Sequence, residues 1–135
     1  MSYLLDTNSW IEHLRRGTAS KVTARLAAAP PGSVCLCSVV LAELVYGALR
    51  SGPAHQAANL ALLAKLRQQF VSLPFDDQAA EEYGKVRAHL AALGTPIGPN
   101  DLLISAIALA NGMTLVTHNT TEFSRVPGLV LEDWQ

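Results

Sequence analysis

Tyr3-Leu4-Leu5-Asp6-Thr7-Asn8 opens the chain as a short apolar run that ends on an acid and two small polar residues. An apolar run closed by a turn signal predicts a buried strand. If this strand is central in a parallel sheet, Asp6 lies just past its carboxyl end, where open α/β sheets bind their ligands. The stretch therefore predicts a buried strand with Asp6 at its carboxyl end, and the role of Asp6 depends on which residues join it at that edge.

Short β-like runs alternate with helical patterns along the rest of the chain. Further strands are expected at 34–37, 70–73, 113–117 and 129–131. Helices are expected at 9–16, 20–28, 39–49, 54–69, 77–93 and 100–110, with a helical turn at 121–125. Strands that alternate with helices predict a parallel sheet with helices on both faces. We expect one three-layer α/β domain over residues 1–135.

Several expectations concern helix ends and helix burial. Ser38 is a natural N-cap for the helix over 39–49, which is apolar on nearly every side and is therefore expected to be buried. Pro99 suits the first position of its helix and so puts Asp101 in the first turn. In the helix over 54–69, the residues expected to point inward are Leu60, Leu63 and Leu66.

The composition indicates a partner but no membrane. Half of the residues are hydrophobic and 16% are charged, which suggests surface kept for a partner. Apolar stretches fall short of the roughly 20 residues of a membrane span, and no basic-then-apolar secretion signal opens the chain. We therefore expect a cytoplasmic protein, with Cys35 and Cys37 as free thiols. The formal charge of −1 neither favours nor excludes nucleic acid.

Three acidic residues stand in apolar surroundings: Asp6, Glu43 and Asp101. Each has an ordinary interpretation by itself, as a helix N-cap, a snorkelling or interface residue and a helix-dipole partner, respectively. All three, however, fall near strand ends or on the helices just after them, at the same edge of a parallel sheet. If they meet, their repulsion needs a cation, and oxygen ligands favour Mg²⁺ or Mn²⁺.

The order and spacing of several motifs resemble the PIN domain ribonucleases and, within them, the VapC toxins of bacterial toxin-antitoxin pairs. The matching segments are 5–8, 38–44 with Gly47, 94–101, 116–123, and 126–129 ahead of 132–134. The resemblance implies a central parallel sheet in the order 3-2-1-4-5. It also implies that Asp6, Glu43 and Asp101 bind Mg²⁺ or Mn²⁺. Asn119 takes the place of the fourth acid of the family and is expected to be catalytic, by ligating the metal or orienting a bound water, and Glu122 one turn later is expected to supply the charge.

The resemblance also implies an activity and its partners. The implied activity is that of a metal-dependent endoribonuclease that inhibits translation and growth, and the products expected of metal-activated water are a 5′-phosphate and a 3′-hydroxyl. The implied substrate is tRNA cut in its anticodon loop, with mRNA as the alternative. The implied partners are a VapB-type antitoxin whose C-terminal segment blocks the site and a second toxin copy, within a larger toxin-antitoxin complex.

Other polar residues are expected to support this site. Thr7 and Asn8 would tie the acid-bearing turn to water at the metal or to neighbouring backbone. Ser105, one turn after Asp101, is positioned to hydrogen-bond its carboxylate, and Ser38 is expected to act mainly as a cap. The basic residues that are candidates for RNA phosphates are Arg15, Arg16 and Arg50.

Rival classes fit the sequence less well. A haloacid-dehalogenase-type phosphatase needs a second aspartate where Asn8 stands, and a receiver domain needs a late-strand lysine, whereas no lysine follows Lys85. The alternative that stays open is a degenerate PIN scaffold that binds RNA or a protein without cutting. Asn119 in place of the fourth acid is its support.

Overall fold

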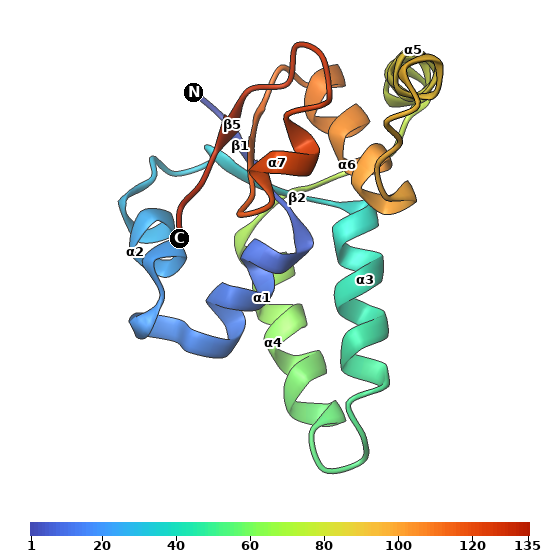
Figure 1. Cartoon of the computed structure of the whole chain (residues 1–135). Coiled ribbons are helices and arrows are strands. Elements are labelled where there is room, and N and C mark those ends of the chain that lie inside the picture. The colour runs from blue at the N-terminus through green and yellow to red at the C-terminus, as the bar shows by residue number, and fades with distance from the viewer.

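The computed structural model describes residues 1–135 and contains five strands and seven α-helices, with one or two α-helices between successive strands (Figure 1). The strands are β1 (Tyr3–Leu5), β2 (Val34–Cys37), β3 (Ser72–Leu73), β4 (Thr114–Val116) and β5 (Leu131–Glu132). The helices are α1 (Thr7–Arg16), α2 (Lys21–Ala28), α3 (Ser38–Leu49), α4 (Gln56–Gln69), α5 (Asp77–Leu93), α6 (Pro99–Ala110) and α7 (Thr120–Phe123).

The strands form one parallel sheet in the order β3-β2-β1-β4-β5, which confirms the order implied by the sequence motifs. In the β1–β4 pair, Leu5 is the register partner of Val116. The next residues along the two strands, Asp6 and Thr117, therefore emerge side by side at the carboxyl edge. The Asp6 N–H donates to the Val116 carbonyl at 3.0 Å and continues the pairing to this edge.

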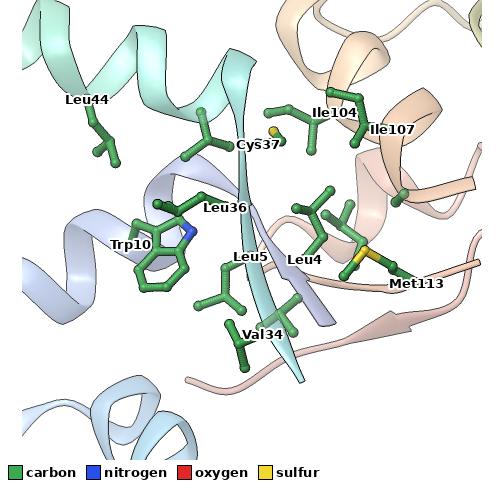
Figure 2. Packing of buried hydrophobic residues seen from close by; sticks show 14 of the residues in the cluster. Leu4, Leu5, Trp10, Val34, Leu36, Cys37, Leu44, Ile104, Ile107 and Met113 are labelled. Carbon is green, nitrogen blue, oxygen red and sulfur yellow. The ribbon is translucent and has the colours of Figure 1, made fainter. Parts of the chain in front are cut away.

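Alternating side chains of the central strands fill a core on each face of the sheet. Figure 2 shows Leu5 on the side of Trp10 from α1, whereas Leu4 lies on the side of Ile104 from α6. All four side chains are fully buried. A period of two along β1 therefore fixes α1 and α6 on opposite faces. Both helices begin close to the carboxyl edge, where Asp6 and Asp101 lie.

The helices that surround the sheet divide into pairs. Figure 1 shows α3 and α4 as a hairpin that extends beyond the sheet, and α5 beside α6 at the other end of the molecule. A separate apolar cluster joins α5, α6 and the segment after α7, through Val86, Leu90, Leu102 and Val126. No helix is long and apolar enough to cross a bilayer.

The expected burial of α3 and α4 was partly wrong. Only one stripe of α3 is buried, whereas Tyr46 is 66% and Leu49 51% exposed. In α4, Leu63 and Leu66 are buried as expected, but Leu60 is 36% exposed. The helical period turns one face of each helix toward the domain, and no other element of the chain covers the outer face of the hairpin.

The expected helix and strand ends also needed correction. Ser38 is not the cap of α3, because it is the first helical residue and Cys37 stands at the N-cap without a side-chain hydrogen bond. Helix α4 begins at Gln56 rather than at 54, and the two edge strands are short, with β5 shifted to Leu131–Glu132. Because an edge strand pairs on one side only, the apolar pattern of the sequence predicts poorly where it begins and ends. The expected N-terminal position of Pro99 in α6 and the free thiols were confirmed.

Candidate active site

Asp6 is buried at the carboxyl end of β1 and caps helix α1. Its Oδ1 accepts the Ser9 N–H at 2.9 Å, and its Oδ2 accepts the Thr117 hydroxyl at 2.6 Å. The Thr117 oxygen in turn accepts the Asn119 N–H at 3.0 Å, so its one proton is directed at Asp6. The N-cap and the site-residue interpretations of Asp6 are thus compatible, since each carboxylate oxygen keeps a free lone pair.

Glu43 reaches the same edge from the second turn of α3. Its Oε1 accepts the hydroxyl of Thr7 at 2.6 Å. Thr7 was expected to bind water or backbone, but it instead links the turn after β1 to an acid of another helix. The short bond fixes the carboxylate of Glu43 beside the start of α1.

Glu122 is fixed by two donors from different segments. Its Oε1 accepts the Gly98 N–H at 2.7 Å, and its Oε2 accepts the Asn119 amide at 2.8 Å. These bonds, with the Gly98 N–H first, lower the pKa of Glu122. Glu122 therefore connects α7 with the loop that leads into α6. An ideal Cβ built on Gly98 would lie 3.5 Å from Asp101 Oδ2 and 3.7 Å from Glu122 Oε1, so both acids lie close to this glycine.

Asp101, in the first turn of α6, differs from the other acids because its carboxylate accepts no hydrogen bond from the protein. Burial, followed by the charges of Glu122, Asp6 and Glu43, raises its pKa to about 6. The structure thus brings the three predicted acids and Glu122 within electrostatic range of one another, and it leaves one of them unpaired.

This donor set fits a hard divalent cation. The acids offer only oxygen, three of them are oriented by hydrogen bonds, and the half-buried Asp101 gains from any cation that offsets its neighbours. No three acid, histidine or cysteine side chains are close enough to bind one ion as they lie. Ligation by Asp6, Glu43 and Asp101 together thus requires side-chain movement, for which the unpaired Asp101 is the freest.

The predicted hydrogen bond from Ser105 to the Asp101 carboxylate is absent. Ser105 is fully buried, but its hydroxyl donates to the Asp101 backbone carbonyl at 2.8 Å instead of to the carboxylate. A serine inside a helix finds the carbonyl four residues earlier within reach, and this local bond competes with the carboxylate. Asn8 is exposed and has no side-chain hydrogen bond with the protein.

The sequence interpretation missed Thr117 and Gly98 as parts of the site. Thr117 had one signal, a polar residue at the end of a buried strand in one of the quoted motifs. Its contact with Asp6 depends on the β1–β4 register, which the sequence alone did not reveal. Gly98 acts through its N–H, for which the residue type carries no signal.

Two hollows adjoin the acids, one on each side of α1. The first, the hairpin groove, has a volume of about 940 Å³ and lies between α1, α3 and α4, with Thr7, Glu43, Tyr46 and Leu62 in its walls. The second, the polar hollow, has a volume of about 600 Å³ and runs from Asp6 and Asn119 past α1 to Gln135. Half of the residues around the groove are hydrophobic, whereas Ile11 is the one hydrophobic residue around the polar hollow.

A parallel sheet in this order, with acids from β1, α3 and α6 at its carboxyl edge, has the architecture of a PIN domain. The PIN domain family model matches residues 3–129, and the chain belongs to this family. Within the family it is similar to VapC proteins over nearly its whole length. It is 40% identical over 134 residues to the tRNA(fMet)-specific endonuclease VapC of Shigella flexneri, covering 99% of this chain and 98% of that protein.

Solved structures agree with this assignment. The DNA-bound VapBC complex of Salmonella typhimurium contains a chain with a TM-score of 0.91 and 36% identity, covering 100% of this chain and 99% of that one. VapBC2 of Rickettsia felis, bound to a DNA fragment from its promoter, gives a TM-score of 0.90 and 33% identity, with both chains fully covered. The family resemblance drawn from the sequence motifs is confirmed.

Proposed function

We propose that this chain is the toxin of a VapBC-type toxin-antitoxin module, a Mg²⁺- or Mn²⁺-dependent endoribonuclease that acts in the bacterial cytoplasm. The observation that carries the proposal is the unpaired Asp101 beside three acids that donors hold in place. Relatives of high coverage are ribonucleases by name, which supports hydrolysis of RNA.

Asp6, Glu43 and Asp101 would hold the cation. The chemistry that a divalent ion supplies to phosphodiester hydrolysis is charge neutralisation at the phosphate and activation of the attacking water. The Ser9 N–H and the Thr117 hydroxyl orient Asp6, and the Thr7 hydroxyl orients Glu43. Glu122 holds the loop before α6 through the Gly98 N–H and thereby positions Asp101. Asn119 orients Glu122 instead of supplying a charge of its own.

We propose tRNA as the substrate, cut in the anticodon loop, with arrest of translation and growth as the consequence. The support is the similarity over the whole chain to endonucleases whose names specify tRNA(fMet), from Shigella flexneri and Salmonella typhimurium. Sequencing of RNA 5′ ends after induction of the chain tests this. Ends confined to an anticodon loop are expected, whereas ends scattered over mRNA would reject it.

We propose a VapB-type antitoxin as the protein partner, with a toxin homodimer inside the larger complex. Solved relatives include VapBC complexes and FitAB bound to a DNA fragment. The exposed apolar side chains of α3 and α4, with Tyr46, Leu49 and Leu62 foremost, offer a surface for that partner next to Glu43. Co-purification of a tagged toxin with its co-expressed antitoxin, and its loss in Tyr46→Asp, tests the assignment.

The test of the activity uses the purified chain freed of antitoxin. It should cleave RNA with Mg²⁺ or Mn²⁺ and lose cleavage in EDTA, and Asp6→Asn or Asp101→Asn should abolish the activity. Cleavage that persists in both variants would point to a contaminant.

The alternative, a degenerate scaffold that binds without cutting, draws on Asn119 at the fourth acid position. Calorimetry separates the two: the nuclease binds Mn²⁺ in a manner that requires Asp6 and Asp101, whereas a scaffold binds none.

A further inference from the structure

Helix α1 is the partition between the hairpin groove and the polar hollow. Asn8, Ile11 and Arg15 border both spaces, and their spacing of three and four residues puts them on one face of the helix. The two spaces differ in chemistry, because the groove is half hydrophobic and the hollow is polar except for Ile11. They therefore suit different ligands, although both reach the acids.

Asp6, the acid that follows β1, lies in the wall of the polar hollow. Asp6 and Asn119 stand at one end of it, and Asn8, His118 and Gln135 offer amide and imidazole groups along it. Glu43 lies in the wall of the other space. A chain of nucleotides whose phosphate lies at the acids can continue into a volume of about 600 Å³ lined by hydrogen-bonding groups.

Three exposed arginines were candidates for phosphate contacts, and the structure distinguishes them. Arg16 borders the polar hollow but is paired with Glu12 at 3.1 Å. Arg50 borders only the hairpin groove, and its guanidinium lies 5.4 Å from the ring centre of Tyr46. Arg15 borders the hollow and has neither an acid partner nor an aromatic one. The imidazole Nδ1 of His118, which also borders the hollow, lies 2.9 Å from Asp133 Oδ2.

We propose that the polar hollow binds the single-stranded RNA nucleotide next to the cleaved phosphate, and that Arg15 contacts that nucleotide's phosphate. The proposal rests on the ribonuclease function proposed above. Of the charged groups around the hollow, Arg16 and Glu12 pair with each other, Asp6 belongs to the proposed cation site, and Arg15 is the one cation without a partner. The amides of Asn8, Asn119 and Gln135 complete a polar lining, which together with Arg15 suits an anionic, polar ligand. A peptide that buries apolar side chains would find one hydrophobic wall here, whereas the hairpin groove offers ten hydrophobic residues.

The experiment measures binding of a short, labelled single-stranded oligoribonucleotide to the full chain by fluorescence anisotropy, in EDTA and over a series of salt concentrations. Arg15→Gln removes the charge and keeps most of the side-chain length, and Arg15→Lys keeps the charge. Arg67→Gln is the matched control, because Arg67 is an exposed arginine of α4 that borders neither space.

Arg15→Gln should weaken RNA binding roughly tenfold and lower the slope of log K against log salt by about 0.7, the value for one phosphate contact to a single strand. Arg15→Lys should keep the slope, and Arg67→Gln should change neither quantity. Unchanged melting temperatures are expected for all three, since none of these side chains has an ion-pair partner in the protein.

Equal losses in Arg15→Gln and Arg67→Gln, or no loss in Arg15→Gln, would overturn the proposal. The proposal would also be wrong if Arg15→Gln lost antitoxin binding but kept RNA binding, because the hollow would then bind a protein instead of RNA. Mn²⁺ calorimetry on the wild type and on Arg15→Gln keeps the two hypotheses apart. Absent Mn²⁺ binding in both proteins counts against the nuclease, whereas the RNA measurement in EDTA tests the hollow by itself.

Discussion

Asp6 and Asp101 flank the same site, yet the protein treats their carboxylates in opposite ways. Asp6 is more deeply buried but accepts two hydrogen bonds, one to each oxygen. Asp101 is half-buried and accepts none, and its pKa rises to about 6. The site thus has two unlike sides. On the oriented side, hydrogen bonds fix the Asp6 carboxylate, whereas on the frustrated side the Asp101 carboxylate faces burial and like charges without a donor. The frustrated side is where a cation yields the larger gain.

Thr117→Val should produce the largest loss of stability and metal affinity, because it removes the hydroxyl that donates to Asp6, whereas Asp101 has no such donor. It leaves Asp6 Oδ2 and the Asn119 N–H without their partner, which costs about 1–3 kcal/mol of unfolding free energy. Loss of a group that orients a metal ligand typically weakens metal affinity about 10- to 100-fold. Denaturant unfolding and Mn²⁺ calorimetry measure the two losses.

The control for this change is Thr114→Val, since Thr114 is buried in β4 three residues before Thr117 and its hydroxyl has no hydrogen bond with an acid. Thr117→Ser should restore metal affinity because it keeps the hydroxyl. If Thr114→Val weakened Mn²⁺ binding as much as Thr117→Val, a general effect on β4 would explain the loss, and the positioning role of Thr117 would be rejected.

Asparagine substitutions should change stability in opposite directions on the two sides of the site. Because the pKa of Asp101 rises from 3.8 to about 6 in the folded chain, the native state binds its proton more tightly than the unfolded state. Stability is therefore lost as pH rises through this window. In metal-free buffer above pH 6, Asp101→Asn should stabilise the protein by about 1 kcal/mol, after a discount for solvent screening. Below about pH 4 the gain should vanish.

Asp6→Asn should instead destabilise the protein at neutral pH, since its amide group cannot accept the Thr117 hydroxyl at the same position. Melting curves of both variants from pH 4 to pH 8, in EDTA and with Mn²⁺, test the contrast. Mn²⁺ should raise the melting temperature of the wild type and remove the advantage of Asp101→Asn. If Asp101→Asn destabilised the protein at pH 7 in EDTA, the conclusion that the metal-free Asp101 carboxylate is unfavourable in the folded state would be wrong.

The sequence was sufficient for the features that depend on local pattern. The apolar run before Asp6 predicted β1, and the three acids found in apolar surroundings lie within electrostatic range of one another in the structure. Pairing across the sheet was less accessible: the Asp6–Thr117 contact follows from the register of Leu5 with Val116. Burial of α3 was overestimated because its composition shows how apolar a helix is but not which face another element covers.

Substitutions of Glu122 test whether it belongs with the oriented acids. Glu122→Gln can still accept the Gly98 N–H, and a flip of the Asn119 amide restores the second bond, so stability should change little. Glu122→Ala loses both bonds and should cost about 1 kcal/mol. If Glu122 positions the loop, Glu122→Gln keeps most of the RNA cleavage and Glu122→Ala does not. Equal loss of cleavage in both variants would instead make its charge essential, as expected of a metal ligand.

Gly98→Ala should have the smallest effect, and it tests the space between the carboxylates of Asp101 and Glu122. The new methyl group would lie 3.5 Å from Asp101 Oδ2 and 3.7 Å from Glu122 Oε1, which is ordinary van der Waals contact. The backbone φ of −55° suits alanine, so unfolding free energy should change by less than about 0.5 kcal/mol. The methyl group displaces water from Asp101, so the metal-free pKa of that carboxyl should rise further. An NMR titration of Asp101 measures this shift, and Gly84→Ala, at an exposed position of α5 with open space around it, is the control. A lowered pKa in Gly98→Ala would show that repulsion from Glu122, relieved by a shift of the loop, outweighs desolvation at Asp101.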